Sequence, residues 1–218
     1  MTVMFEIENL ALFIISGIIL NILPGPDSLY VIGRSARHGF LGGSLASLGI
    51  GAGTFVHIFA AAFGISAILA ASAAAFTLVK IIGCLYLVYL GLTLLFAKHA
   101  GESRSLAVPE VSRGDSAWKI FSQGFLTNVL NPKVALFFLA FVPQFIAATS
   151  VHKTAAFLLL GLIFNINGMI WCHLLAWFSA TVSNRIGRSK KLALWLSRAA
   201  GSLFCYFGLR LALSQNSG

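Results

Sequence analysis

Charged residues are scarce in this sequence of 218 residues, because Asp, Glu, Lys and Arg together make up only 10% of it. Soluble domains carry about a quarter charged residues, so this chain has too little polar surface to cover a water-soluble fold. Hydrophobic residues account for 58% of the chain. The composition therefore predicts an integral membrane protein in a lipid bilayer and excludes an ordinary soluble domain.

Potential metal-binding and redox residues are also few. The three cysteines, Cys84, Cys172 and Cys205, stand far apart in apolar runs and form no CxxC pair. A redox carrier needs paired cysteines, and a metal site needs several carboxylates or thiolates that converge. No hydrolase motif surrounds Ser28, which follows Asp27. We therefore expect no metal site, no cofactor and no enzymatic activity.

The N-terminal region lacks the features of a cleaved signal peptide. Glu6 and Glu8 precede the first apolar run, and no Lys or Arg does, so we expect that run to be retained as a helix. The formal net charge of +9 could suit nucleic acid, but the basic residues stand mainly in segments between apolar runs. That placement is typical of membrane orientation, and no nucleic-acid partner is expected.

Long apolar runs are what the sequence has in abundance. Each has about the 20 residues or more that cross the hydrocarbon core as a helix. The fold class is therefore all-α integral membrane, with six predicted transmembrane helices. A polar cytoplasmic linker, 98–117, separates residues 1–97 from residues 118–218 within one transmembrane domain. The predicted helices lie at about 9–32, 39–69, 74–97, 118–146, 154–182 and 192–213.

The distribution of Lys and Arg predicts the orientation of these helices. Ten basic residues lie between helices one and two, around the linker, and between helices five and six, whereas the opposite side carries only Lys153. Positively charged loops face the cytoplasm. We therefore expect a multi-pass protein with both termini on the outer side. The ten residues are Arg34, Arg37, Lys98, Arg104, Arg113, Lys119, Arg185, Arg188, Lys190 and Lys191.

The two halves of the chain resemble each other. The segment Gly17-Ile-Ile-Leu-Asn-Ile-Leu-Pro aligns with Gly124-Phe-Leu-Thr-Asn-Val-Leu-Asn, and glycine, asparagine and leucine match in register. Weaker matches pair His57 with His173 and the third helix with the sixth. A unit of three helices re-enters the membrane from the opposite side, so the pattern predicts two inverted repeats. Many secondary transporters are built in this way.

Each repeat begins with a helix that proline should break. Proline removes a backbone donor and clashes with the preceding turn, and unwound backbone is tolerated in a membrane only where it lines a protein cavity or water. Inverted-repeat transporters place their substrate near such breaks. The sequence therefore predicts a substrate site formed by both broken helices, one and four. Its candidate residues are Asn21, Pro24, Gly25, Pro26, Asp27, Asn128, Asn131, Pro132 and Lys133.

Asp27 and Lys133 are the charged residues of the two breaks, and two interpretations of them stay open. They could form a buried ion pair that holds two helices together. Alternatively, Asp27 binds a substrate ammonium group or a proton, while Lys133 or a helix end meets a carboxylate. The interpretations are compatible if the pair breaks and re-forms during transport.

Other polar residues inside the apolar runs are weaker candidates. Asn21 and Asn128 could bind substrate or cap the broken helices, and Asn165 and Asn167 could line the same cavity. Asp27, His57 and His173 are candidates for proton coupling. An intramembrane histidine, however, is more often a hydrogen-bonded structural group than a proton carrier.

Three segments resemble a known family. The segment 123–145, Gln-Gly-Phe-Leu-Thr-Asn-Val-Leu-Asn-Pro-Lys through Phe145, is similar to the central signature of the LysE/RhtB amino-acid exporters. Pro24-Gly-Pro-Asp27 resembles the first-helix motif of that family, and Tyr86–Leu92 resembles its third-helix pattern. This resemblance implies a bacterial inner-membrane exporter of amino acids or close derivatives, driven by proton antiport. The family's break residues correspond here to Pro24, Gly25, Pro26, Asp27, Asn131, Pro132 and Lys133.

The sequence favours amino-acid export by alternating access, and the alternative is an exporter of an inorganic or metal ion on the same scaffold. Metal selectivity would require several converging carboxylates or thiolates, but Asp27 is the only acid within the predicted spans. The sequence assigns neither the particular amino acid nor the coupling stoichiometry. It also leaves open whether the protein forms a homo-oligomer.

Overall fold

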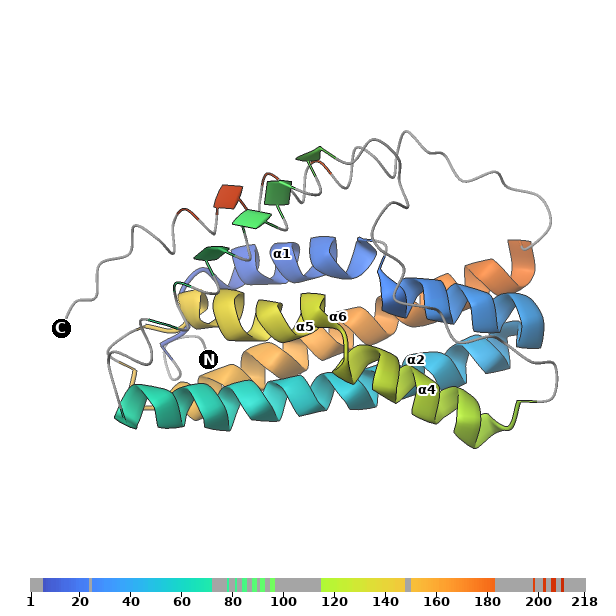
Figure 1. The fold of residues 1–218 in the computed structure, drawn as a ribbon, viewed down its shortest axis with the longest axis horizontal. Coiled ribbons are helices and arrows are strands. Elements are labelled where there is room, and N and C mark those ends of the chain that lie inside the picture. The colour runs from blue at the N-terminus through green and yellow to red at the C-terminus, as the bar shows by residue number, and fades with distance from the viewer. Residues whose placement is uncertain are drawn as a thin grey trace.

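The computed structural model describes residues 6–23, 25–71, 115–147 and 150–182, together with single positions within 78–96 and 198–209 (Figure 1). These residues are helical apart from short connections and one isolated antiparallel bridge between Ile7 and Ile146. The all-α prediction is confirmed for the described part of the chain. The predicted spans 74–97 and 192–213 and most of the linker lie outside the described ranges, so the six-span count and the inverted repeat stay predictions.

The first predicted helix is broken as expected. Helix α1 spans Leu10–Ile22, and the next residue, Leu23, is its C-cap. The backbone N–H of Leu23 donates to the carbonyl of Ile19 (3.1 Å). Helix α2 (Pro26–Ala71) then begins at a proline. Proline is well suited to the first position of a helix because its fixed φ is helical and an N–H there would have no helical partner. Asp27 consequently lies in the first turn of α2.

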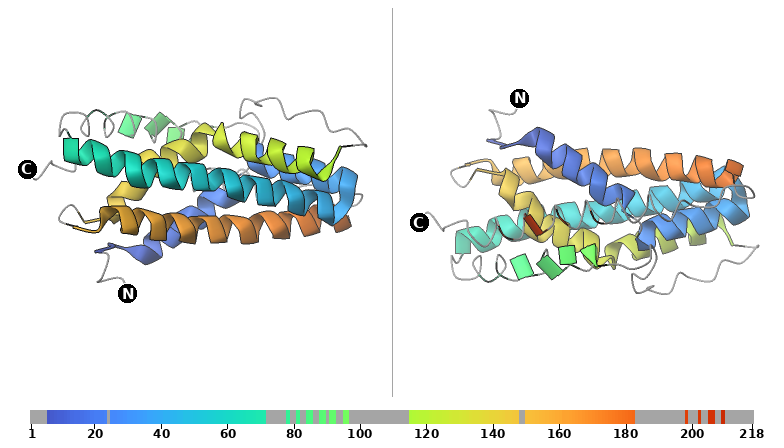
Figure 2. Two further views of the ribbon diagram at one scale, coloured as in Figure 1. Left: turned by 90° about the horizontal axis from the view of Figure 1, so that it is seen from below. Right: turned by 90° about the horizontal axis from the view of Figure 1, so that it is seen from above.

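Helix α2 reverses direction at Gly39, which has φ 65° and ψ −166°. Only glycine adopts this conformation without strain. Residues 26–38, the short arm of α2, pack back against residues 40–71, its long arm (Figure 2). Tyr30 and Val31 of the short arm share a core cluster with Ala46 and Ile50 of the long arm. The sequence predicted that helix one would end near residue 32 and a loop would follow. The structure corrects this prediction, because the helix continues to residue 38.

The predicted loop residue Arg34 is fully buried. Its guanidinium group donates hydrogen bonds to Asp115 and Gln123, and its Nε donates to the Tyr30 hydroxyl (3.1 Å). Asp115 also pairs with Lys119, with 2.6 Å between Oδ1 and Nζ. Arg34 therefore joins the short arm of α2 to the start of α4 and is not a solvent-exposed orienting charge.

The second break separates helix α4 (Ala117–Val129) from helix α5 (Pro132–Leu136), and the segment Pro132–Phe145 as a whole is bent by 46° relative to α4. Helix α5 continues through one π-helical segment, η2 (Phe137–Phe141), and one 3₁₀ segment, η3 (Val142–Phe145). Helix α6 (Lys153–Val182) follows. These bounds confirm the predicted helical segments 118–146 and 154–182 to within a few residues, including the break in the first of them.

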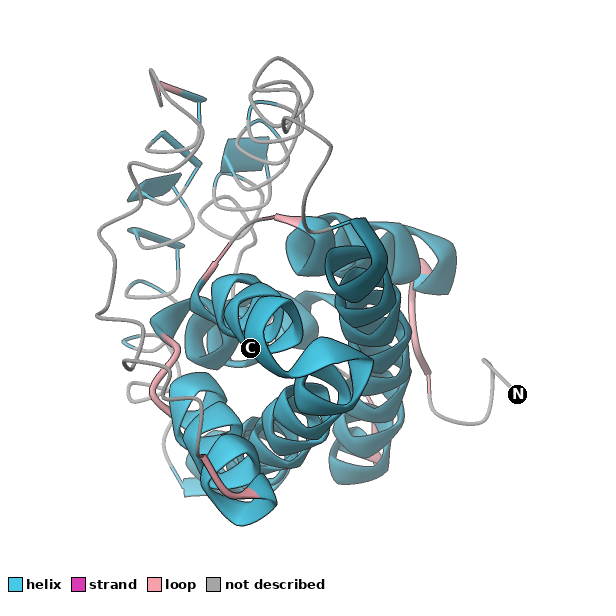
Figure 3. Ribbon diagram, turned by 90° about the vertical axis from the view of Figure 1, so that its right-hand side faces the viewer, coloured by secondary structure: helices cyan, strands magenta, loops and turns pink. Residues whose placement is uncertain are grey.

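Two described helical segments, Pro26–Gly64 and Lys153–Thr181, are long and apolar enough to cross a membrane, and the bent pair of α4 and Pro132–Phe145 can form a third span. Glycines allow these helices to approach closely. A Cβ atom added to Gly49 would lie 2.1 Å from the carbonyl oxygen of Phe121, and one added to Gly161 would lie 2.7 Å from Ile58. Small residues commonly permit such packing in membranes, and Figure 3 shows the resulting bundle end-on.

Candidate functional site

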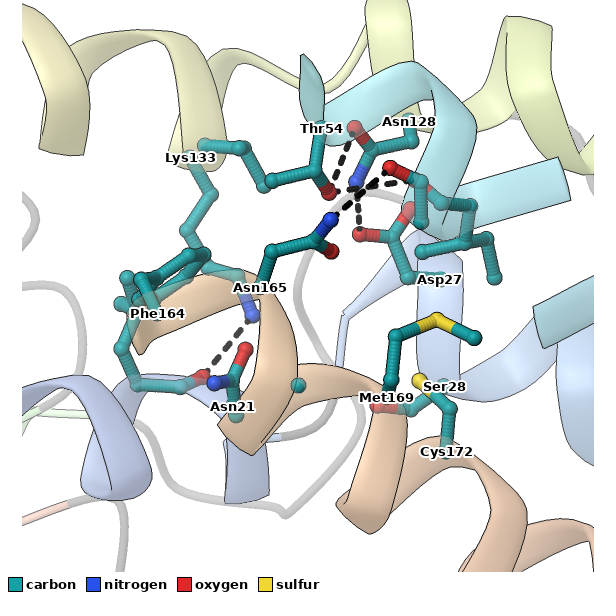
Figure 4. Close-up of a pocket in the computed structure, with 15 residues that line it drawn as sticks. Asn21, Asp27, Ser28, Thr54, Asn128, Lys133, Phe164, Asn165, Met169 and Cys172 are labelled. Atoms are coloured by element: carbon teal, nitrogen blue, oxygen red, sulfur yellow. Dashed lines mark hydrogen bonds between the residues drawn. The ribbon is translucent and has the colours of Figure 1, made fainter. Parts of the chain in front are cut away.

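Asp27 connects the two breaks (Figure 4). Its Oδ2 atom accepts a hydrogen bond from Asn128 Nδ2 at the end of α4 (2.9 Å) and another from Asn131 Nδ2 (3.0 Å). Asn131 is also the N-cap of α5, since its Oδ1 accepts from the backbone N–H of Lys133 (3.0 Å). One carboxylate oxygen of the first break therefore orders both sides of the second break.

Lys133 makes the reciprocal connection. Its Nζ donates to the backbone carbonyls of Leu20 and Leu23, each at 3.2 Å. In an unbroken helix, the carbonyl of Leu20 would accept from the N–H of residue 24, but that residue is a proline and has no N–H. The lysine supplies the missing donor. Within the described residues, no ion pair joins Asp27 directly to Lys133.

Gly25 makes room for this arrangement. A Cβ atom at this position would lie 3.1 Å from Lys133 Nζ, which is tighter than ordinary packing. A side chain at residue 25 would therefore push the amino group away from the carbonyls at the end of α1. The glycine of the Pro-Gly-Pro motif thus has a packing role as well as a place in the turn.

The long arm of α2 supports Asn128 from the other side. Thr54 Oγ1 donates to Asn128 Oδ1 (3.3 Å), and His57 Nε2 hydrogen-bonds the backbone carbonyl of Asn128 (2.9 Å). Asn128 itself is only 1% exposed. Because its side-chain amide is held between Thr54 and Asp27, it positions the carboxylate rather than capping a helix.

A small cavity lies between these groups. It offers about 30 Å³ to the centres of water molecules, which is room for roughly two waters. An amino acid fits only if the surrounding helices move apart. Polar groups of the breaks line part of the cavity, and apolar side chains line the rest. The lining residues are Leu20, Asn21, Asp27, Ser28, Ile50, Gly51, Thr54, Asn128, Lys133, Val134, Phe164, Asn165, Gly168, Met169 and Cys172 (Figure 4).

Two polar atoms at the cavity are buried without a hydrogen-bond partner. They are Oδ1 of Asp27, an acceptor, and Nδ2 of Asn21, a donor. Buried polar groups are nearly always paired, and leaving one unpaired costs about 1–3 kcal/mol. One of these atoms is an acceptor and the other a donor, and both residues line the same cavity. A ligand that carries both a donor and an acceptor would therefore satisfy them.

The structure brings most of the predicted site residues together. Four of them, Asn21, Asp27, Asn128 and Lys133, line the cavity. Others shape the backbone around it: Gly25, Pro26 and Asn131 with Pro132. Pro24 lies outside the described residues.

The two predicted histidines lie in different surroundings. His57 contacts the backbone of Asn128 and stacks on Phe138, with 6.5 Å between ring centroids. His173 Nδ1 hydrogen-bonds the carbonyl of Met169 (2.9 Å), and its Nε2 pairs with the Ser44 hydroxyl (3.1 Å). Only His57 therefore touches the hydrogen-bond network of the two breaks.

Helix α6 lines one side of the cavity. The positions of the prolines did not predict this contribution. Phe164, Met169 and Cys172 line it from this helix, together with Asn165, whose Nδ2 donates to the carbonyl of Gly51 (3.3 Å). The signal for Asn165 was a polar amide in an apolar run, which usually marks a functional interior face. The other three side chains carry no such signal, because they look like ordinary membrane residues.

The chain is similar to known proteins over almost its whole length. The model of the LysE type translocator family matches residues 18–215. Leucine efflux proteins of Salmonella typhimurium and Salmonella choleraesuis are each 30% identical over 212 residues, which cover 97% of this chain and 98% of theirs. An uncharacterized membrane protein of Pseudomonas aeruginosa is 29% identical over 209 residues, 94% of this chain and 95% of its own. No solved structure matches the chain significantly. The chain belongs to the LysE type translocator family.

Proposed function

We propose that this protein is a secondary transporter of the bacterial inner membrane that exports amino acids or close derivatives from the cytoplasm by proton antiport. The observation that carries the proposal is the cavity at the two cross-connected breaks, with its buried carboxylate and unpaired polar atoms. An amino acid presents an ammonium group and a carboxylate on one carbon, which suits polar groups gathered at one part of a cavity. The leucine efflux relatives support the same substrate class.

The rest of the lining favours an aliphatic side chain. Ile50, Phe164 and Met169 supply apolar surface to the cavity, and each buried CH₂ group of a ligand gains about 0.8 kcal/mol from leaving water. We therefore propose neutral aliphatic amino acids such as leucine as the first substrates to test. Lysine and arginine would bring a second positive charge against this apolar surface.

Proton coupling follows from one carboxylate that serves two cations. Asp27 accepts either a proton or the substrate ammonium group, so the two compete for the same site, as antiport requires. His57 connects to this carboxylate through Asn128. Because the cavity is too small for an amino acid, loading requires the helices around it to move apart. Alternating access then consists of opening the cavity to one side of the membrane and then to the other, while Lys133 keeps its bonds at the first break.

Purified protein in proteoliposomes provides the test of this function. Vesicles are loaded with one radiolabelled amino acid from a panel of aliphatic, hydroxylated, basic and acidic species. We expect leucine-like substrates to leave fastest, and a proton gradient opposing the substrate flux to accelerate them. A protonophore should remove that acceleration. Efflux of none of the panel would contradict amino-acid export, and efflux unaffected by the proton gradient would contradict antiport alone.

The exporter of an inorganic or metal ion has no comparable observation in its favour. Among the described residues, no three His, Cys, Asp or Glu side chains gather at one place.

Removing the amino group of Lys133 should impair transport. Lys133→Met keeps the chain length but leaves the carbonyls of Leu20 and Leu23 without their donor. Hydrogen bonds to charged groups contribute about 1.5–3 kcal/mol, so we expect efflux to fall about tenfold or more. Lys153→Met, at the start of α6 and away from the cavity, is the matched control. Equal efflux rates for the two variants would show that Lys133 is dispensable.

The proposed orientation places both termini in the periplasm and the linker 98–117 in the cytoplasm. Fusions of alkaline phosphatase, which is active only in the periplasm, should be active at the C-terminus and inactive within the linker. Green fluorescent protein fusions at the same positions should show the opposite pattern. Alkaline phosphatase activity in the linker would contradict this orientation, because it would place the linker in the periplasm.

A further inference from the structure

We infer that the two unpaired atoms beside the first break recognise the two ends of the amino-acid zwitterion: Asp27 Oδ1 accepts from the α-ammonium group, and Asn21 Nδ2 donates to the α-carboxylate. Lys133 holds the break and does not bind the carboxylate. The inference rests on the proposed function, because it names how the same cavity distinguishes an amino acid from other small molecules. It also decides between roles that the sequence left open for Lys133 and Asn21.

The hydrogen bonds of Asp27 leave one oxygen for a ligand. Oδ2 already accepts from two asparagine amides, at 2.9 and 3.0 Å, whereas Oδ1 is buried and has no partner. Those two amides also prevent the carboxylate group from turning freely. Oδ1 is therefore a preorganised acceptor, and an ammonium group is the ligand chemistry that satisfies a buried carboxylate best.

Asn21 provides the complementary donor. Its Nδ2 is buried and unpaired, and the residue lines the same cavity from α1. Its side-chain amide packs over Gly168 of α6, where an added Cβ atom would lie 3.3 Å from Oδ1 and 3.4 Å from Nδ2. Glycine at residue 168 therefore gives the amide the room it occupies. Asn21 in α1 and Asp27 in α2 stand on the two sides of the Pro-Gly-Pro break, so both ends of a zwitterion are bound by residues that flank one break.

The contacts of Lys133 argue against the lysine as the carboxylate ligand. Both of its hydrogen bonds go to backbone carbonyls at the end of α1. Moving Nζ to a substrate would leave the carbonyl of Leu20 without a donor, since residue 24 is a proline. An unpaired backbone carbonyl in a membrane interior is costly, whereas Asn21 Nδ2 has no contact to give up.

Binding measurements with three ligands test the assignment on the purified full-length protein. Leucine carries both charged groups, 3-methylbutylamine keeps the ammonium group and has no carboxylate, and 4-methylpentanoate keeps the carboxylate without the ammonium group. Ligand-dependent stabilisation in thermal unfolding gives the affinity of each, because a ligand that binds only the folded state raises its stability with concentration. The unmodified protein should bind leucine more tightly than either analogue.

The variants should separate the two ends of the ligand. Asn21→Leu should weaken leucine binding about tenfold and leave 3-methylbutylamine unchanged, because only the carboxylate contact is lost. Asp27→Asn should weaken leucine and 3-methylbutylamine and leave 4-methylpentanoate unchanged. Asn21→Ala removes the donor without adding bulk or charge, and serves if Asn21→Leu does not fold. Asn167→Leu changes an asparagine of α6 that does not line the cavity, and should bind all three ligands normally.

The outcomes distinguish this inference from the proposed function. If the unmodified protein binds leucine but Asn21→Leu weakens 3-methylbutylamine as much as leucine, the assignment of the carboxylate to Asn21 is wrong. If Lys133→Met selectively loses the difference between leucine and 3-methylbutylamine, the carboxylate binds the lysine instead. If the unmodified protein binds none of the three ligands, the amino-acid site itself is wrong and the inference falls with it.

Discussion

Asp27→Asn is expected to lower amino-acid efflux from proteoliposomes by at least about a hundredfold. The substitution keeps the side-chain shape but removes the charge that binds a proton or an ammonium group. It also turns a two-oxygen acceptor into an amide facing the Asn128 and Asn131 amides that now donate to Oδ2. Two hydrogen bonds to a charged group contribute about 1.5–3 kcal/mol each, and about 1.4 kcal/mol corresponds to a factor of ten in rate. Initial rates at saturating substrate, with and without a proton gradient, measure the loss.

The matched control is Glu8→Gln, which removes an exposed carboxylate ahead of α1 and should transport normally. Asp27→Glu keeps the charge but moves it by one methylene group, so we expect an intermediate rate. Substrate exchange without a gradient separates binding from coupling. Proton-driven efflux by Asp27→Asn at the unmodified rate would show that this carboxylate neither binds substrate nor couples the proton.

The second large effect concerns stability. Arg34→Met should destabilise the fold by about 3–5 kcal/mol, since removing one partner of a buried ion pair is strongly destabilising. Asp115 would lose its buried guanidinium partner, and Gln123 and Tyr30 would also lose a donor. We expect a lower midpoint of thermal unfolding in detergent and a smaller folded fraction after extraction. Arg37→Met, at an exposed position in the same helix, should have little effect.

A compensating double variant tests the reason for that loss. Replacing a buried ion pair with apolar side chains of similar volume is often neutral or stabilising. Arg34→Met combined with Asp115→Leu should therefore recover most of the midpoint lost by the single variant. A double variant as unstable as Arg34→Met would show that hydrogen bonds to Gln123 and Tyr30, rather than the broken ion pair with Asp115, are responsible. A single variant of normal stability would contradict the structural role of Arg34.

The two breaks were predictable because proline acts locally. A proline lacks an N–H whatever surrounds it, so Pro26 and Pro132 could be placed at interrupted helices from the sequence alone, and both begin a helix in the structure. Asp27 was identifiable for a similar reason, as the only acid in the predicted spans. A reversal between residues 32 and 39 was also predicted, but not that the helix continues to residue 38 and turns at Gly39, because the mostly polar residues 34–38 are typical of a loop. The burial of Arg34 was missed since a basic residue between spans ordinarily faces the cytoplasm.

Composition and local chemistry by themselves determined that this chain is a helical membrane protein and where its backbone loses hydrogen bonds. Only the tertiary structure decided which groups replace those bonds. The partners of Lys133 Nζ lie 110 and 113 residues away along the chain, and the amides that hold Asp27 lie 101 and 104 residues away. Such pairings depend on how α1, α2, α4 and α5 pack, and α6 completes the cavity with side chains of ordinary membrane character. A break is a property of the residues within one turn, whereas a binding site is a property of the helices that meet there.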